Sequence, residues 1–295
     1  MALKTNPIDI NRNTTGLELT PEQSNEIWAG AIEQSAVMRL AQRVSLPGSG
    51  ITIPIITGDP VANWVAETAE KPTGTSTFST KDMTPYKIAV IELFSNEFRR
   101  DLPRLYRELV RRLPASIGAK FDETVFTGTA PGSNFDVLSG ATQAGIGGTG
   151  TYGKLVNVFT TLAAADAELT GWALSPQGEG ILLAATDNAG RPLLINSINN
   201  DSAVGRVLGA PVMKSKRVYK AGTPNIVGFA GDWSQARYGV VDGINLSISE
   251  EATINTGTEQ VNLWQRNMFA VRVEAEVGFI VRDTAAFVAL TDATA

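Results

Sequence analysis

Apolar and polar residues alternate most regularly near the C-terminal end of the chain. From Phe269 to Val281 every second residue is apolar, and the residues between them include Arg272, Glu274 and Glu276. This alternation predicts a strand with one buried face and one face in water or at an interface. At about 3.3 Å per residue the strand would span roughly 43 Å, far more than the usual strand of about five or six residues. We therefore expect an elongated body.

A second periodic segment predicts a long amphipathic helix from Asp101 to Phe126. At roughly 1.5 Å per residue the helix would be about 38 Å long, and Pro114 in its interior is expected to bend it. Its apolar stripe, with steps of three and four, consists of Phe98, Leu102, Leu105, Leu109, Leu113, Ile117, Phe121 and Val125. Another face carries Arg100, Arg104, Arg107 and Arg111. Such charges usually form a solvated face, and Asp101 and Glu108 are suitable partners.

Two short alternating segments flank a long polar stretch near the start of the chain. Ile51, Ile53 and Ile55 predict one strand, and residues 86–91, YKIAVI, predict another. The stretch between them, VANWVAETAEKPTGTSTFSTKD at residues 61–82, is rich in threonine, serine and charge. Segments of this length without a core of their own are usually functional or disordered. We therefore expect a long hairpin that projects from the body.

The remaining segments give weaker signals. Residues 1–19 are polar and lack periodicity, and a helix is expected to begin at Thr20, which is followed by proline and a capping-box glutamine. A further amphipathic helix is predicted from Leu155 to Leu169. Residues 172–264 alternate short apolar segments with turn signals, and a half-buried strand is expected around residues 244–248.

The composition excludes several kinds of chemistry. The 295-residue chain contains no cysteine and no histidine, which rules out disulfides, thiolate metal sites and Ser-His-Asp triads. Its net charge is −5 and it has no block of basic residues, so nothing indicates tight nucleic-acid binding. It also lacks a membrane-length apolar run and an apolar signal segment. We expect a non-enzymatic protein of a cytosol-like compartment, with no catalytic residue, cofactor or metal.

One motif points in another direction. Residues 145–150, GIGGTG, match the G-x-G-x-x-G pattern of dinucleotide-binding loops. The pattern has physical meaning only after a strand, which delivers the pyrophosphate to a helix N-terminus. Residues 138–144, LSGATQA, contain no apolar run, so no strand is expected there. We interpret the segment as a flexible loop, and a nucleotide-dependent oxidoreductase is only a distant alternative.

A set of short motifs follows the order found in one known family. The motifs are SNEI (24–27), EQS (33–35), RV (43–44), IP (53–54), ANWVAE (62–67), TPYKIA (84–89), SNEF (95–98), FD (121–122), FTG (126–128), GRPL (190–193), GAPV (209–212), GDWSQ (231–235), RVE (272–274) and AF (286–287). Each motif alone is weak, but the ordered set over roughly residues 20–290 is specific. The chain resembles the major capsid proteins of tailed bacteriophages, the family with the Hong Kong 97 fold.

The resemblance implies an α+β fold of the Hong Kong 97 type, with a long kinked spine helix, long peripheral strands, an extended hairpin loop and an axial domain. The implied boundaries are 1–50 for the N-terminal arm and helix, 51–92 for the extended loop, 93–154 with 263–295 for the peripheral domain, and 155–262 for the axial domain. The implied function is a coat protein that self-assembles into the icosahedral shell around double-stranded DNA.

The implied partners are copies of the same chain in pentamers and hexamers, a portal, separate scaffolding or decoration proteins, and packaged DNA contacted non-specifically, with no membrane. The implied location is the virion, assembled in the host bacterial cytoplasm, and no fused scaffolding segment is expected before Thr20. The expected inter-subunit residues are Trp64, Val65, Glu67, Glu70, Lys71, Phe78, Arg100, Arg104, Arg107 and Arg111. Trp64 and Val65 are expected to be buried by a neighbouring subunit, or at the hinge of the hairpin.

An encapsulin-type nanocompartment shell has the same fold and is the alternative. Encapsulins typically have a cargo-binding first helix and a shorter extended loop, so the polar N-terminal arm and the long loop here favour the virus. Some capsid proteins join a loop lysine covalently to an asparagine of a neighbour. Lys71 and Lys81 lie in the loop, and Asn262 and Asn267 lie near the last strand, but no motif fixes a pair and we expect no cross-link.

Overall fold

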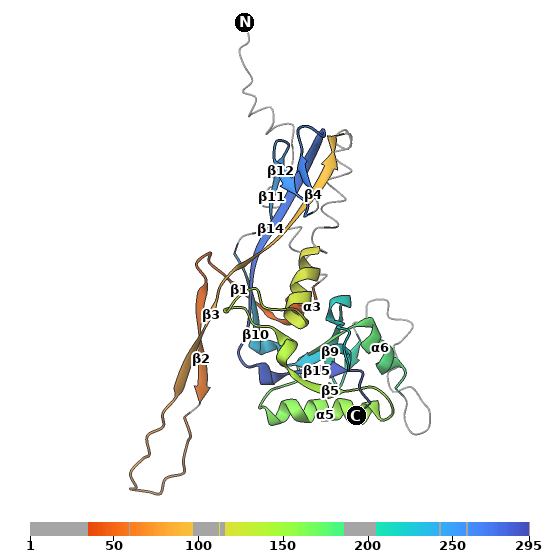
Figure 1. Ribbon diagram of the computed structural model, residues 1–295. Coiled ribbons are helices and arrows are strands. Elements are labelled where there is room, and N and C mark those ends of the chain that lie inside the picture. The colour runs from red at the N-terminus through yellow and green to blue at the C-terminus, as the bar shows by residue number, and fades with distance from the viewer. Residues whose placement is uncertain are drawn as a thin grey trace.

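The computed structural model describes residues 35–58, 60–96, 112, 116–185, 205–241, 243–257 and 259–294. A long narrow sheet occupies the upper half of the view in Figure 1, a broader sheet with two helices lies below it, and a hairpin leaves the body at the lower left. The expected N-terminal arm, most of the helix predicted from Thr20 and the first half of the long helix lie outside the described residues. The elongated body predicted from the sequence is confirmed.

One long strand, β14 (Met268–Val281), organises the narrow sheet. β4 (Tyr86–Ser95) runs antiparallel along one edge of it. On the other edge β11 (Asn245–Ser249), the half-buried strand predicted around residues 244–248, pairs with the first half of β14, and β10 (Ala236–Val240) pairs with the last part. β1 (Gln42–Ser45) pairs parallel with β10. The sheet is therefore widest around Val277, where β4, β14, β10 and β1 overlap.

The two faces of β14 match the predicted alternation. The odd-numbered residues from Phe269 to Val281 are all buried, in one core with the helix of residues 116–126. On the other face Arg272 is exposed and Glu276 is half-buried, where Glu276 forms an ion pair with Lys87 of β4 at 3.2 Å. The charged face thus lies toward solvent, as its sequence predicts.

The broader sheet has the strand order β5-β15-β9-β6-β8-β7. Its strands, in that order, are Thr142–Gly145, Phe287–Thr291, Ile226–Gly231, Gly171–Leu174, Ala210–Lys214 and Arg206–Val207. One face packs against α5 (Thr151–Ala164) and α6 (Pro176–Leu183) in a separate core. Side chains of the other face, such as Phe229 and Ala289, belong to the core of the narrow sheet. The broader sheet is therefore buried on both faces.

The helix α5 confirms the helix predicted from Leu155 to Leu169, but with different ends. It begins at Thr151 and stops at Ala164, because Asp166 takes a left-handed conformation with φ of 55°. The amide of Ala167 then donates to the carbonyl of Leu162 at 3.0 Å, which satisfies one of the last free carbonyls of the helix.

The described part of the predicted long helix comprises residues 112 and 116–126. Ile117, Phe121 and Val125 of the predicted apolar stripe are buried, and so is Phe126, whose ring stacks on Phe229 of β9 with 5.2 Å between centroids. This helix therefore packs against both sheets within one shared core. The remaining turns, with Pro114, lie outside the described residues, so the length and the kink stay predictions.

The projecting hairpin is present, but one of its strands was predicted wrongly. β2 (Ile51–Gly58) pairs antiparallel with β3 (Thr77–Met83), whereas residues 86–91 belong to β4 in the narrow sheet. β3 falls in the stretch that the sequence predicts as a loop. Its sequence, TFSTKDM, is mostly polar and exposed, so it gives no alternating signal from which a strand could be predicted. The hairpin therefore runs over residues 51–83, with residues 60–76 as its loop.

The remaining short elements connect these parts. They are α3 (Ala36–Leu40), β12 (Thr253–Asn255), β13 (Gln260–Asn262) and 3-10 turns at Leu138–Gly140, Lys216–Val218, Trp233–Gln235 and Thr284–Ala286. β12 and β13 form a small hairpin at the tip of the narrow sheet (Figure 1).

Candidate assembly surface

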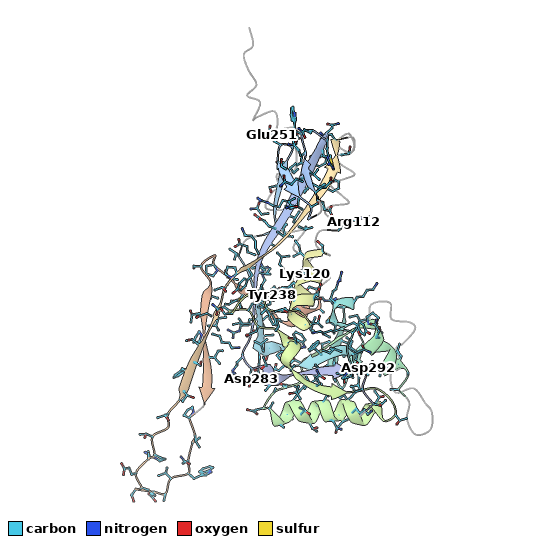
Figure 2. All side chains as sticks on the ribbon, in the orientation of Figure 1. Arg112, Lys120, Tyr238, Glu251, Asp283 and Asp292 are labelled. Carbon is cyan, nitrogen blue, oxygen red and sulfur yellow. The ribbon has the colours of Figure 1, made fainter. Side chains whose placement is uncertain are left out.

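The hairpin carries large apolar side chains that its own subunit does not bury. Trp64 is fully exposed, at 105% of its reference area, and Phe78 is 70% exposed. Val61 and Val65 are exposed as well. Figure 2 shows the outer part of the hairpin standing clear of the body, with the side chains of its loop surrounded by open space. The second of the two expected positions for Trp64, a hinge against its own long helix, is therefore wrong.

The charged candidates of the loop share this exposure. Glu67, Glu70 and Lys71 are all exposed. The arginine face expected at residues 100–111 lies outside the described residues, so its contact with acidic loop residues stays a prediction. The structure thus brings together the apolar and charged candidates of one hairpin, over residues 60–78.

Sequence reasoning missed a second exposed tryptophan at the opposite end of the molecule. Trp264 is 76% exposed in the turn between β13 and β14. Hydrogen bonds hold this turn: the amide of Gln265 donates to the Asn262 side chain at 3.1 Å, and Arg266 donates to both carboxylate oxygens of Glu259 at 2.9 and 3.0 Å. The signal was in the sequence, where Trp264 stands within the largely polar run VNLWQRN.

Lys81, at the base of the hairpin, contacts its own subunit. Its ammonium group donates to Asp136 Oδ2 at 2.8 Å and to the Val281 carbonyl at 2.6 Å. The same oxygen of Asp136 accepts the amide of Val281 at 2.9 Å. This arrangement ties β3 to the end of β14, whereas Lys71 extends into solvent with the loop.

A fully buried carboxylate, Asp122, joins three distant segments of the subunit. Its Oδ1 accepts the Ser35 hydroxyl at 2.6 Å and the Val37 amide at 3.2 Å. Its Oδ2 accepts the Ala36 amide and the Ser215 hydroxyl, both at 3.0 Å. Burial raises the pKa of Asp122 above its usual value of 3.8, and the four hydrogen bonds oppose this increase. Asp122 thus fixes the start of α3 on the helix of residues 116–126.

The glycine motif at residues 145–150 corrects one sequence interpretation. A strand does precede it, because β5 ends at Gly145 and α5 follows. β5 gave no apolar signal because it is a short edge strand with side chains that are exposed or half-buried. The glycines instead accommodate the end of the chain: a Cβ on Gly147 would lie 2.1 Å from the carbonyl oxygen of Asp292. The amide of Gly147 donates to the Ala293 carbonyl at 3.1 Å.

A hollow of about 550 Å³ lies between β4 and the helix of residues 116–126. Its lining combines aromatic rings, including Tyr86 and Phe121, with Lys87 and Lys120. Both lysines are in ion pairs, Lys87 with Glu276 and Lys120 with Glu123 at 3.5 Å.

Two features are absent from the part of the chain that the structure describes. It contains no cluster of three or more acidic, histidine or cysteine side chains with the geometry to hold a metal ion. Within the same part, none of the helices has the length and apolar character required to cross a membrane.

The sequence has close counterparts among known proteins. Residues 16–292 match the model of the phage capsid family. Over 290 residues the chain is 35% identical to the probable major capsid protein gp17 of Mycobacterium phage D29. The matched region covers 93% of this chain and 90% of that protein. The chain is 34% identical over 298 residues to the probable major capsid protein gp17 of Mycobacterium phage L5, with 94% and 90% covered.

The fold is also similar to solved structures. A chain from Gordonia phage Cozz superimposes with a TM-score of 0.71 and 22% identity, covering 89% of this chain and 87% of that chain. A chain from Mycobacterium phage Adephagia gives a TM-score of 0.69 with 20% identity, covering 89% and 91%. At this identity the likeness concerns the fold, and it confirms the predicted Hong Kong 97-like architecture. Because a family model matches almost the whole sequence and relatives exceed 30% identity over it, the chain belongs to the phage capsid family.

Proposed function

We propose that this chain is the major capsid protein of a tailed bacteriophage, and that its copies assemble into the icosahedral shell that encloses double-stranded DNA. The observation that carries the proposal is Trp64, fully exposed on a projecting hairpin in a chain that matches the phage capsid family. The phage names of the similar proteins favour this function over an encapsulin-type shell.

Burial of the hairpin loop by a neighbouring subunit gives assembly a physical driving force. An aromatic side chain buries about 150–250 Å² when it is covered, which corresponds to about 4–6 kcal/mol before the costs of association. Phe78, Val61 and Val65 add apolar area on the same hairpin. Each contact is modest, but closed symmetry repeats it for every subunit, and the shell as a whole becomes stable.

The charged candidates fit the same contact. Glu67 and Glu70 are exposed beside Trp64, and we assign the arginines at 100, 104, 107 and 111 as their partners on a neighbouring subunit. Exposed pairs of this kind contribute about 0–1 kcal/mol each and mainly orient the partners. If particles carrying Arg104→Ala and Arg107→Ala have unchanged stability, this assignment is wrong.

The remaining parts of the chain have proposed places in the shell. Residues 155–262 supply most of an axial domain near the centre of each pentamer or hexamer, and residues 93–154 with 263–295 supply most of the peripheral domain. The two sheets exchange strands across these boundaries: β5 and β15 join the broader sheet, and β10 and β11 join the narrow one. The hairpin within residues 51–92 crosses to a neighbour, and residues 1–50 form the N-terminal arm and helix. The portal, separate scaffolding or decoration proteins, and DNA contacted without sequence specificity are the further partners. Assembly takes place in the host cytoplasm and the chain has no catalytic function.

A single substitution tests the proposal. Trp64→Ala removes a side chain with no contacts inside the subunit, so the free energy of unfolding should change by less than about 0.5 kcal/mol. Shell formation, measured by negative-stain microscopy and sedimentation, should be strongly reduced. Trp64→Phe, which keeps most of the apolar area, is the matched control and should assemble. Normal shells from Trp64→Ala, or unfolding of that variant, would contradict the proposal.

A further inference from the structure

The base of the hairpin rests on a pair of glycines in the narrow sheet. Gly239 of β10 and Gly278 of β14 are direct cross-strand partners. A Cβ on Gly239 would lie 2.7 Å from Leu46 Cβ and 2.9 Å from Met83 Sδ, and a Cβ on Gly278 would lie 2.7 Å from Met83 Cγ. A residue larger than glycine therefore does not fit at either position without displacing Leu46 or Met83. We call this pair the glycine notch.

The side chains that pack in the glycine notch, Leu46 and Met83, flank the two strands of the hairpin at its base. Leu46 comes just before the turn into β2, and Met83 is the last residue of β3. Both are buried, in a small core that also contains Ile53 and Ile280. Because Gly278 and Ile280 lie on the face of β14 opposite Phe279, the hairpin base and the helix of residues 116–126 occupy opposite faces of the sheet.

Lys81 gives the hairpin a second attachment, at the edge of the sheet instead of its face. β4 pairs with β14 only as far as Val277, so the end of β14 is not covered by β4. There the Val281 amide donates to Asp136, and the Val281 carbonyl accepts from Lys81. Two attachments on different sides of one strand restrict both the tilt and the rotation of a rigid body.

Beyond these attachments the hairpin separates from the body. A hollow of about 280 Å³ lies between them, with Ile53, Pro54 and Ile55 on one wall and Gln235 and Arg237 on the other. The outer residues of β3 and the hairpin loop are exposed. The direction of the hairpin is therefore determined at its base.

We infer that the glycine notch and the Lys81–Asp136 contact set the direction in which the hairpin leaves the subunit, and that these residues position Trp64 for its contact with a neighbour. β3 has seven residues, which span about 23 Å, so a tilt of about 10° at Met83 moves its far end by about 4 Å. A displacement of this size separates an apolar side chain from its pocket. The part of the inference that concerns assembly rests on the proposed function.

The direction of the hairpin can be measured on the isolated subunit. Because the chain has no cysteine, Thr75→Cys and Ala164→Cys allow two spin labels to be attached, one on the hairpin loop and one at the end of α5. The distance distribution between them reports the hairpin angle. We expect Gly278→Ala to shift the mean distance by several ångströms or to broaden the distribution, and to cause loss of shells. Gly140→Ala, where an added Cβ meets nothing within 4 Å, is the matched control and should change neither.

Lys81→Met keeps the test valid if Gly278→Ala does not fold. It removes the ammonium group but leaves the aliphatic stem and the bond between Asp136 and Val281, and we expect a broadened distribution that Lys81→Arg restores. Unchanged distributions in both Gly278→Ala and Lys81→Met would overturn the inference. A shifted distribution with a normal yield of shells would overturn the link to assembly, and with it the proposed contact of the hairpin, whereas the role of the glycine notch in setting the angle would stand.

Discussion

Asp122 is a buried acidic group whose desolvation cost is partly offset by hydrogen bonds from two distant segments. Two of its four donors are amides at the start of α3, and the others are hydroxyls of Ser35 and Ser215. The carboxyl group therefore caps the free amides at the start of α3, although it lies about 85 positions away in sequence. The first described turn of the chain is held in place by a residue of the long helix, which couples the N-terminal segment to the core.

Replacement of Asp122 by alanine should be strongly destabilising. The substitution leaves two amides and two hydroxyls without their acceptor in a buried site, and a buried polar group that loses its partner costs about 1–3 kcal/mol. We expect a loss of about 3–5 kcal/mol in the free energy of unfolding, measured by denaturant titration of the subunit. Ser215→Ala, which removes one of the four bonds, should cost only about 1 kcal/mol. A decrease of less than about 1 kcal/mol in the free energy of unfolding for Asp122→Ala would show that the four hydrogen bonds do not stabilise the fold.

The raised pKa of Asp122 makes a prediction about pH. Because burial favours the neutral carboxyl, the folded subunit keeps this proton at a pH where the unfolded chain has released it. The contribution of Asp122 to stability is therefore complete below the unfolded value of 3.8 and is lost as the pH rises through the higher folded pKa. The stability difference between the wild type and Asp122→Asn, which cannot titrate, should shrink from acidic toward neutral pH. A difference that grows with pH would mean that the four donors outweigh burial and lower the pKa.

At the scale of elements, α6 shows how two glycines in one short helix have different roles. Gly178 packs against β9, and a Cβ there would lie 2.5 Å from the carbonyl oxygen of Val227. Gly180 faces solvent, and a Cβ there would meet nothing within 4 Å. The first glycine permits close packing of the helix on the sheet, and the second only weakens the helix.

Alanine at the two positions should therefore have opposite effects. Gly180→Ala should stabilise the subunit by about 0.5–1 kcal/mol, because alanine restricts the unfolded chain and favours the helix. Gly178→Ala should destabilise it by about 1–3 kcal/mol, because the backbone of β9 leaves no room. Thermal unfolding of the two variants beside the wild type measures both changes. Equal effects at the two positions would contradict the packing of α6 on β9.

The elements that the sequence predicts well are those that carry their own periodic signal. Alternation over residues 269–281 predicted β14 because one face of that strand is buried for its full length. β3 and β5 carry no such signal: β3 is polar on both faces, and β5 is an edge strand of four residues. They are strands because they pair with β2 and β15, which are separated from them in sequence. Local periodicity does not contain this information.

The candidate site shows the same division. Trp64 stood out because a large apolar residue in a polar segment needs a partner, and the structure confirms that its own subunit provides none. The glycine notch was not predictable, since nothing in the sequence around Gly239 or Gly278 tells that Leu46 and Met83 pack on them. Long-range contacts of this kind depend on the pairing of strands whose partners are distant in sequence.

At the scale of the whole molecule, burial is distributed very unevenly. Each edge of β14 is paired for most of its length; one face is buried throughout, and the other is buried where the hairpin base packs on it. The hairpin has two strands and is anchored only at its base. Isolated two-stranded hairpins are at best marginally stable in water. The subunit therefore consists of a stable body and an appendage whose outer half gains little from the fold.

This difference predicts the pattern of amide hydrogen exchange. In dissociated subunits the amides of β14 should exchange only through global unfolding, whereas amides in the outer part of β2 and β3 and in residues 60–76 should exchange through local opening, orders of magnitude faster. In assembled shells the hairpin amides should become strongly protected, while those of β14 change little, because assembly covers the hairpin and not the core of the body. Exchange followed by mass spectrometry on both states, with β9 as an internal reference, measures this directly. Hairpin amides as protected in the free subunit as those of β14 would mean that the hairpin is stable without a neighbour.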